Sequence, residues 1–379
     1  MDRRTFLGAA CSAAAWPMAT PVVLASAPGE RRLVVIVLRG GLDGIGMVQP
    51  YGDPAFAKLR PTIAETDKLN DLDGFYGLAS AFSDLLPMWH AGDLGFVSAV
   101  STPYRSKRSH FGGQDVLENG GGHADGQLTE SGDGWLNRAL ALIPGARAET
   151  AMAVGQEHML LLHGSRPVGT WSPRNSLDLE DDERRLLSRM YENDPLFSQA
   201  LAGANMFSDS GAGRRETATT LAEFAAKRLN GPARIAAFSV GGWDTHRRQG
   251  RVITRPARAL AAALAALKSG LGKNWEQTAV LAVTEFGRTA RENGSGGTDH
   301  GTGGMMIVAG GAVAGGKVHG TWPGLGEGRL FEDRDLMPAD DIRRWAAWML
   351  AGQFGLDRSS LEKTVFPGVD LGVNPGILR

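Results

Sequence analysis

Short, continuous apolar segments alternate with longer amphipathic segments along most of the chain. The short segments are apolar at nearly every position, which is typical of strands buried on both faces of a parallel sheet. The longer segments repeat apolar residues at helical spacing and therefore predict helices that pack on such a sheet. This order predicts an α/β fold with a mostly parallel central sheet sandwiched by helices. The predicted strands are 33–38, 94–100, 151–154, 233–240, 278–284 and 305–309, and the predicted helices are 78–90, 135–143, 180–204, 214–229, 253–271 and 339–354.

The first 25 residues do not fit this alternation. Arg3 and Arg4 are followed by Thr-Phe-Leu and then by an Ala-rich, weakly apolar stretch, which is the pattern of a twin-arginine export signal. An amphipathic core helix is the alternative, but such a helix seldom begins with this motif. We therefore expect residues 1–25 to be a signal peptide, cut before Ser26, and the mature chain to be periplasmic or secreted. The single cysteine, Cys11, lies inside the signal, so the mature chain has no thiol ligands and no disulfides.

Composition narrows the possible partners of the chain. The 40 Lys and Arg residues nearly balance the 41 Asp and Glu residues, so the chain lacks the basic character of a nucleic-acid-binding protein. After the signal, no apolar run approaches the roughly 20 residues that a membrane span needs. No shift in composition marks a domain boundary. We expect one domain over residues 31–379, with a helical or loop insert around 156–210.

Candidate ligand residues follow three predicted strands, each time next to glycine. Asp43 follows the first strand, Asp244 and His246 follow the strand that ends at 240, and a Gly-rich loop lies between the last two strands. That loop contains Glu285, Arg288, Asp299 and His300. Since the carboxyl ends of parallel strands meet at one edge of a sheet, these side chains are expected to converge. Carboxylate and imidazole ligands without cysteine suit a divalent metal, Zn²⁺, Mn²⁺, Mg²⁺ or Ca²⁺.

Ser109 begins a predicted helix and follows three basic residues, Arg105, Lys107 and Arg108. One interpretation is a helix N-cap, a common place for serine. The other is a nucleophile, because a helix start and neighbouring cations favour a bound phosphate or sulfate. His110 is not assigned as its base, since neighbours at a helix start point in different directions. A pair of divalent cations would suit phosphoryl or sulfuryl transfer to such a serine. The catalytic residues expected here are Ser109, Arg108 and Arg288.

Five motifs, in this order along the chain, carry a family resemblance. They are RGGLDG (39–44), RSHFGGQD (108–115), GGWDTH (241–246), TEFGRT (284–289) and GTDHGTGG (297–304). Together with the twin-arginine leader, they resemble the bacterial domain-of-unknown-function 1501 family, from about residue 33 to the C-terminus. That family looks like a branch of the alkaline phosphatase/sulfatase superfamily. The resemblance implies an alkaline phosphatase-like fold, a nucleophile at a helix start and a metal centre of Asp and His.

The resemblance also implies individual roles. Asp43 is similar to the metal-binding Asp of the first strand, and Ser109 to the nucleophile. Asp244 with His246 resembles the superfamily's Asp-x-x-x-His pair, at a shorter spacing. Glu285 stands where another ligand pair begins, but Phe286 occupies the place of its His and cannot bind a metal. His300 is similar to the late His that precedes a strand ending in Gly. In the alternative alignment, Asp299 and His300 supply the Asp-His pair and His319 is the late His. The expected metal ligands are Asp43, Asp244, His246, Glu285, Asp299 and His300.

Two functions follow from these observations. The first is an exported, metal-dependent hydrolase of small-molecule phosphate or sulfate esters that uses a Ser nucleophile. The second is an exported, non-catalytic protein of the same fold that binds a cell-surface or secreted partner. Retained Ser109, Asp43 and Asp244 favour the enzyme, whereas Phe286 and the Gly-rich loops favour the binding protein. Bound metal in the purified protein would favour the first.

Overall fold

The computed structural model describes residues 29–105, 107–121, 132–172 and 216–379 of the 379-residue chain. The predicted signal peptide, the predicted helix 180–204 and most of the predicted insert lie outside these residues. The limits of the single domain are not tested by the structure and stay predictions. In the described residues, no helix is long and apolar enough to cross a membrane.

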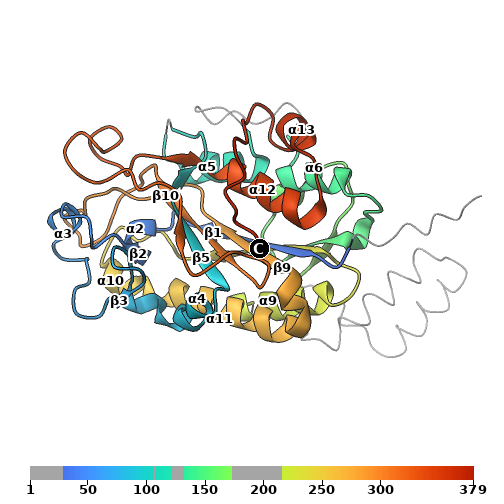
Figure 1. The fold of residues 1–379 in the computed structure, drawn as a ribbon, viewed down its shortest axis with the longest axis horizontal. Helices are drawn as coiled ribbons and strands as arrows, with labels where there is room; N and C mark the ends of the chain where they lie inside the picture. The colour runs from blue at the N-terminus through green and yellow to red at the C-terminus, as the bar shows by residue number, and fades with distance from the viewer. Residues whose placement is uncertain (1–28, 106, 122–131, 173–215) are drawn as a thin grey trace, which may run out of the picture.

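A nine-stranded sheet lies at the centre of the fold (Figure 1). Its strand order is β11-β5-β10-β9-β1-β8-β6-β7, and β12 pairs with β5. Every pairing is parallel except those of β10, so the predicted α/β fold with a mostly parallel sheet is confirmed. The strands are β1 (Arg32–Arg39), β5 (Leu94–Ser101), β6 (Ala151–Val154), β7 (Gly169–Trp171), β8 (Ile235–Gly241), β9 (Thr278–Val283), β10 (Gly304–Ala309), β11 (Val318–His319) and β12 (Asp340–Asp341).

The direction of β10 was predicted wrongly. It runs antiparallel to β9 and to β5, although its sequence is as apolar as that of a buried parallel strand. The connection from β9 to β10, residues 284–303, contains no helix. Without a crossover, the chain re-enters the sheet from the edge at which β9 ends, and the strand must run the opposite way. The whole 284–303 loop therefore stays at the carboxyl edge of the parallel strands.

Both faces of the sheet are buried under helices (Figure 1). In β1, Val34 and Ile36 belong to the core on one face, whereas Leu33 and Val35 belong to the core on the other. This alternation explains why the strand is apolar at every position. One face is covered by α4 (Leu86–His90), α9 (Ala218–Leu229) and α11 (Thr254–Leu271), and the other by α5 (His110–Asn119), α6 (Trp135–Leu142), α12 (Ile342–Phe354) and α13 (Arg358–Ser360).

Local sequence explains where several helices begin and end. Thr217 caps α9 by accepting a hydrogen bond from the Thr220 amide, and Asp341 caps α12 in the same way from the Arg343 amide. Gly120 and Gly355 end α5 and α12 in the left-handed conformation that glycine adopts without strain. The predicted helix 78–90 is wrong in its first half. Residues Ser80–Leu85 form a 3₁₀ helix, and α4 starts only beside Pro87, which lacks the N–H that a continuous α-helix needs.

The remaining elements lie mostly at the carboxyl edge of the sheet. A small three-stranded sheet of order β2-β4-β3 is formed by β2 (Val48–Gln49), β3 (Asn70–Asp71) and β4 (Gly77–Leu78). Short helices α2 (Gly44–Met47), α3 (Phe56–Leu59) and α10 (Gln249–Val252) complete this end of the fold. Helix α10 leads almost directly into α11.

Candidate metal centre

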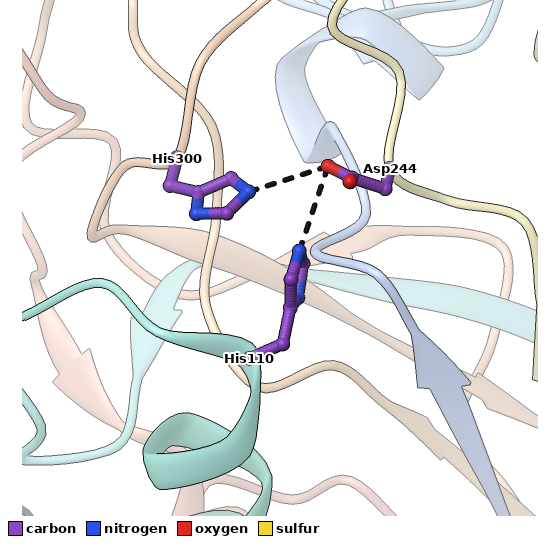
Figure 2. Close-up of side chains that lie close together, drawn as sticks. All are labelled: His110, Asp244 and His300. Atoms are coloured by element: carbon purple, nitrogen blue, oxygen red, sulfur yellow. Dashed lines mark hydrogen bonds and ion pairs between the residues drawn. The ribbon is translucent and has the colours of Figure 1, made fainter.

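Three segments that are distant in sequence meet at the carboxyl edge of the sheet. The loop after β8 carries Asp244 and His246, the first turn of α5 carries His110, and the β9–β10 loop carries His300. Figure 2 shows both His110 and His300 pointing at the Asp244 carboxylate. Ligand atoms of His110, Asp244 and His300 all lie within 4.8 Å of one another.

One oxygen of Asp244 is the centre of this cluster. Its Oδ1 atom lies 3.5 Å from His110 Nε2, 3.3 Å from His300 Nε2 and 3.0 Å from His246 Nε2. The Nε2 atoms of His246 and His300 are also 3.0 Å apart. Three imidazole nitrogens thus lie within 3.5 Å of this oxygen, and we call the four residues the Asp244 cluster. His246 contacts Asp244 and His300 but is not part of the closest group of His110, Asp244 and His300.

The outer nitrogen of each imidazole faces an acceptor. The Nδ1 atoms lie 2.8 Å from Glu285 Oε1 for His110, 3.0 Å from Asp299 Oδ1 for His246 and 2.7 Å from the Arg108 carbonyl oxygen for His300. Carboxylate and carbonyl oxygens only accept, so we assign the proton of each neutral ring to Nδ1. Each Nε2 then presents a lone pair to the cluster. Imidazoles held from behind in this way are typical of metal ligands.

Glu285 is held rigidly behind His110. The carboxylate is buried and accepts hydrogen bonds from the Gly40 amide, the Gln114 side chain and the Thr284 hydroxyl. Burial raises the pKa of the Glu285 carboxyl, but the hydrogen bonds, led by that of His110, outweigh burial and lower it overall. The same hydrogen bond is the main reason why the pKa of His110 is raised. Glu285, expected as a metal ligand, therefore orients the imidazole of His110.

Neighbouring groups shift the pKa values of Asp244, Asp299 and His300. Burial raises the pKa of Asp244, but the hydrogen bond and charge of Arg288 lower it overall. Burial likewise raises the pKa of Asp299, and hydrogen bonds from Asn293 and His246 lower it below its usual value. Burial is the main cause of the lowered pKa of His300, which favours its neutral, metal-binding form.

Arg288 brings a fixed positive charge to the cluster. Its Nη2 atom is 2.5 Å from Asp244 Oδ1, and its Nη1 atom is 3.5 Å from His246 Nε2. The side chain is fully buried. Its guanidinium donates to backbone carbonyl oxygens of four residues: Gly40, Gly41, Trp243 and Thr298. Because these hydrogen bonds hold the guanidinium in place, the positive charge of Arg288 stays at a fixed position beside Asp244.

Glycine makes this close packing possible at two positions. A Cβ atom on Gly40, where φ is +120°, would lie 2.6 Å from the Asp244 amide nitrogen. A Cβ atom on Gly287 would lie 1.8 Å from the Gly303 carbonyl oxygen. Gly40 thus lets the loop after β1 contact the loop after β8, and Gly287 lets the two ends of the β9–β10 loop touch.

Asp43, expected as a ligand, lies outside the Asp244 cluster. Its carboxylate oxygens are 2.6 and 2.9 Å from Arg60, and they also accept hydrogen bonds from Gln249 and from the Gly46 amide. Asp43 and Arg60 are both almost completely buried. Asp43 was expected to bind a metal but pairs with Arg60 instead, and the sequence pattern does not place Arg60 beside the first strand.

Ser109 lies between two residues that contact the cluster. The carbonyl of Arg108 binds His300, and the side chain of His110 belongs to the cluster. Ser109 is the N-cap residue of α5, but its side chain makes no capping hydrogen bond. The guanidinium of Arg108 instead pairs with Asp335, at 3.1 Å, and with Glu332. Arg108 therefore offers the cluster its backbone and not its charge.

Two residues of the site were missed in the sequence. His110 was considered only as a base for Ser109 and was not assigned that role, yet its ring enters the cluster. Its position at the start of a helix that follows a central strand was the available signal. The Phe286 ring, which cannot bind a metal, packs against the rings of His110 and His300 with centroids 5.1 and 4.9 Å apart. It holds two ligand candidates in place.

The sequence comparison identifies the family. The model of the family described as "Protein of unknown function (DUF1501)" matches residues 91–365. The chain belongs to this family, and the resemblance noted in its motifs is confirmed. A search for similar sequences among curated proteins finds no match.

Solved structures that resemble the chain include members of the alkaline phosphatase superfamily. One is a superfamily protein from Vibrio parahaemolyticus, with 12% identity over 82% of this chain and 69% of that chain, at a TM-score of 0.38. Another is the C-terminal periplasmic domain of EcEptC from Escherichia coli, with 10% identity over 90% of this chain and 88% of that chain, at a TM-score of 0.40. A third is a variant of TAB5 alkaline phosphatase with Mg bound, with 11% identity over 74% of this chain and 90% of that chain, at a TM-score of 0.35.

Proposed function

We propose that the chain is an exported, metal-dependent hydrolase of phosphate or sulfate esters. The observation that carries the proposal is the donor set of the Asp244 cluster. Three Nε2 atoms lie within 3.5 Å of one carboxylate oxygen, and acceptors that face one another need a cation or a proton between them.

The residues that would hold the metal are His110, His246, His300 and Asp244. Three imidazoles with one carboxylate suit Zn²⁺ better than Mg²⁺ or Ca²⁺, which prefer oxygen ligands. A bound Zn²⁺ would act as a Lewis acid toward an ester oxygen. Asp299 and Glu285 orient two of the imidazoles from behind.

We propose one ion per chain and not the pair considered from the sequence. Arg288 already lies 2.5 Å from Asp244 Oδ1, so one side of this oxygen is taken by a side-chain cation. Asp43, which would serve a second ion, is neutralised by Arg60. A second divalent cation beside the buried guanidinium would be repelled by it.

Ser109 is the proposed nucleophile. It lies directly before His110 at the amino end of α5, where the helix dipole and backbone N–H groups favour an anionic ester group. Its oxygen would attack phosphorus or sulfur and release the alcohol, and water would then release the acid from the serine. Arg288 supplies positive charge next to the reacting group. The side chain of Arg108 has no such role in this proposal, because it is paired with Asp335 and Glu332.

The test combines metal analysis with turnover. The purified mature chain, loaded with Zn²⁺, should contain about one ion per chain, and it should hydrolyse an aryl phosphate or an aryl sulfate. Ser109→Ala should retain the ion and lose turnover, whereas Ser101→Ala, a matched change at the end of β5, should retain both. Turnover by Ser109→Ala equal to that of wild type would remove the nucleophile from the proposal.

The non-catalytic binding protein is the second candidate. The closed Asp43–Arg60 pair and the neutralised Arg108 favour it, since both withhold charged groups that catalysis was expected to use. A protein that binds Zn²⁺ tightly but turns over neither ester would support this candidate.

Export is a separate part of the proposal and rests on Arg3 and Arg4. Changing both to Lys should leave the precursor in the cytoplasm, as fractionation and immunoblotting would reveal. Normal accumulation of this variant outside the cytoplasm would remove export from the proposal.

A further inference from the structure

A dense group of arginines follows the Asp244 cluster in the chain. Directly after His246, five arginines occur within residues 247–258, and residues 247–271 contain no Asp or Glu. Helices α10 and α11 carry the last three of them. Positions 251, 255 and 258 are separated by four and three residues, the spacing that places side chains on one side of a helix. We call this group the arginine stripe: Arg247, Arg248, Arg251, Arg255 and Arg258.

The arginine stripe is exposed and has no ion-pair partner in the part of the chain that the structure describes. All five residues are exposed to solvent. No carboxylate within residues 29–105, 107–121, 132–172 and 216–379 forms an ion pair with any of them. Several other arginines of the described residues do form ion pairs, as in Arg60 with Asp43 and Arg343 with Asp341. The stripe thus gathers five exposed arginines within twelve residues, without a carboxylate partner among the described residues.

The position of the stripe is unfavourable for stability. Arg251 and Arg255 lie at the amino end of the α10–α11 pair, and α11 is 18 residues long. The positive end of a helix dipole favours acidic residues and disfavours cations. Like charges one helical turn apart also repel one another. A bound anion would remove both penalties.

A cavity lies beside the stripe. It has a volume of about 860 Å³ and is lined by the end of β8, the start of α9 and the α10–α11 pair. Arg251 and Arg255 line one side, and the exposed Gly241 and Gly242 line another, two residues before Asp244. Two carboxylates also line it: Glu216, and Glu157, which pairs with Arg39. The cavity is large enough for several monomer units of a polymer.

We propose that the arginine stripe and this cavity bind a linear, soluble polyanion, a polymer that carries sulfate or phosphate groups along its length. One of its ester groups would reach the Asp244 cluster. The proposal rests on the proposed function, because it assigns the class of ester that the site acts on. The helical pitch of about 5.4 Å separates successive arginines by roughly one sugar unit, so each charge can meet a different unit of the polymer.

The test measures binding and needs neither metal nor turnover. Fluorescein-labelled dextran sulfate is titrated with the mature chain, and anisotropy is recorded at about 50 mM and about 300 mM sodium chloride, which differ in charge screening. The triple variant Arg251→Gln, Arg255→Gln, Arg258→Gln should bind at least about tenfold more weakly at the lower salt concentration. Its affinity should also depend less on salt than that of wild type.

A matched variant removes the same charge elsewhere. Lys58→Gln, Lys273→Gln, Arg329→Gln changes three exposed cations outside the stripe and should bind dextran sulfate within about twofold of wild type. Equal weakening in both triple variants would show a general effect of net charge and overturn the proposal. Absence of binding by wild type would overturn it as well.

Two further measurements separate the remaining explanations. The stripe variant should melt at or above the temperature of wild type, because it removes cations from a helix amino end. A lower melting temperature would assign the arginines a structural role and overturn the proposal.

Binding of wild type to phosphatidylglycerol vesicles, but not to dextran sulfate, would assign the stripe to a membrane surface and overturn the proposal. A chain that binds dextran sulfate but hydrolyses no ester would contradict the proposed function and leave the polyanion site standing.

Discussion

Asp43 and Asp244 follow neighbouring, directly paired strands of one sheet, and the structure places them in opposite environments. Each comes shortly after two glycines at the carboxyl end of its strand, β1 or β8. Asp43 is 2% exposed, and its carboxylate accepts hydrogen bonds from Arg60, Gln249 and a backbone amide. The side chain of Asp244 is 47% exposed and faces three imidazoles and one guanidinium.

The difference lies in what other parts of the chain bring to each carboxylate. Arg60 comes from the end of α3 and also donates to the carbonyl oxygens of Thr289 and Ala290, so it joins two loops through Asp43. The nitrogens around Asp244 come from three segments, and most of them are acceptors. A buried carboxylate surrounded by donors is a structural element, whereas an exposed carboxylate that faces three imidazole acceptors has the surroundings of a candidate metal ligand.

The largest difference between substitutions of the two carboxylates is expected in the affinity for Zn²⁺. Asp244→Ala should weaken Zn²⁺ binding on the order of 1,000-fold, because it removes one of four ligands. Competition against a chromogenic chelator would measure the affinity. Asp115→Ala, an exposed change on α5, is the control and should retain full affinity. An Asp43→Ala variant that lost Zn²⁺ as completely as Asp244→Ala would contradict the comparison.

For the stability of the fold, we expect the opposite order: loss of the Asp43 carboxylate should matter more than loss of the Asp244 carboxylate. Asp43→Ala should lower the free energy of unfolding by about 3–5 kcal/mol, since it leaves the Arg60 charge buried without its partner. Urea denaturation of the metal-free chain would measure this loss. Asp370→Ala removes a carboxylate from an exposed pair with Arg358 and should cost less than about 1 kcal/mol. If the two variants lost equal stability, Asp43 would not be the structural carboxylate described here.

A smaller effect should come from the residues behind the imidazoles. Asp299→Asn leaves the Asp244 cluster intact but weakens the acceptor of His246 Nδ1. Zn²⁺ affinity should fall by about 10–100-fold, as measured by the same competition assay. Glu292→Gln, in the same loop but bonded to Thr62 and Ile63, should leave affinity unchanged. A loss in Glu292→Gln as large as that in Asp299→Asn would indicate disturbance of the loop as a whole.

The smallest effect should be the change in stability of Ser109→Ala. The Ser109 side chain makes no capping hydrogen bond, so the free energy of unfolding should change by less than about 0.5 kcal/mol. Thr217→Ala, which removes a hydroxyl that accepts from the Thr220 amide, should cost about 1 kcal/mol. Thermal denaturation of both variants measures the difference. If Ser109→Ala and Thr217→Ala lost equal free energy of unfolding, Ser109 would be a helix cap.

Much of the fold could be predicted because burial is visible in the pattern of residues. Strands β1 and β9 lie between two cores and are apolar at almost every position, so their bounds were predicted to within one residue. Helix α11 was predicted to within one residue from the spacing of its leucines. The convergence of Asp244, His246 and His300 followed from the rule that parallel strands end at one edge.

Other features depend on contacts that no local pattern records. β10 runs antiparallel to its neighbours because the connection that precedes it contains no helix. The sequence of the strand does not reveal this, since a buried apolar strand has the same composition in a parallel and in an antiparallel pair. Arg60 decided that Asp43 is enclosed in a buried ion pair, and the tertiary placement of α5 brought His110 to Asp244 and His300. By itself, the sequence determined which segments are buried and which side chains lie at the carboxyl edge of the sheet, since both follow from periodicity and strand order. Only the tertiary structure decided which donors and acceptors meet there, because such pairs join segments up to 248 residues apart in the chain.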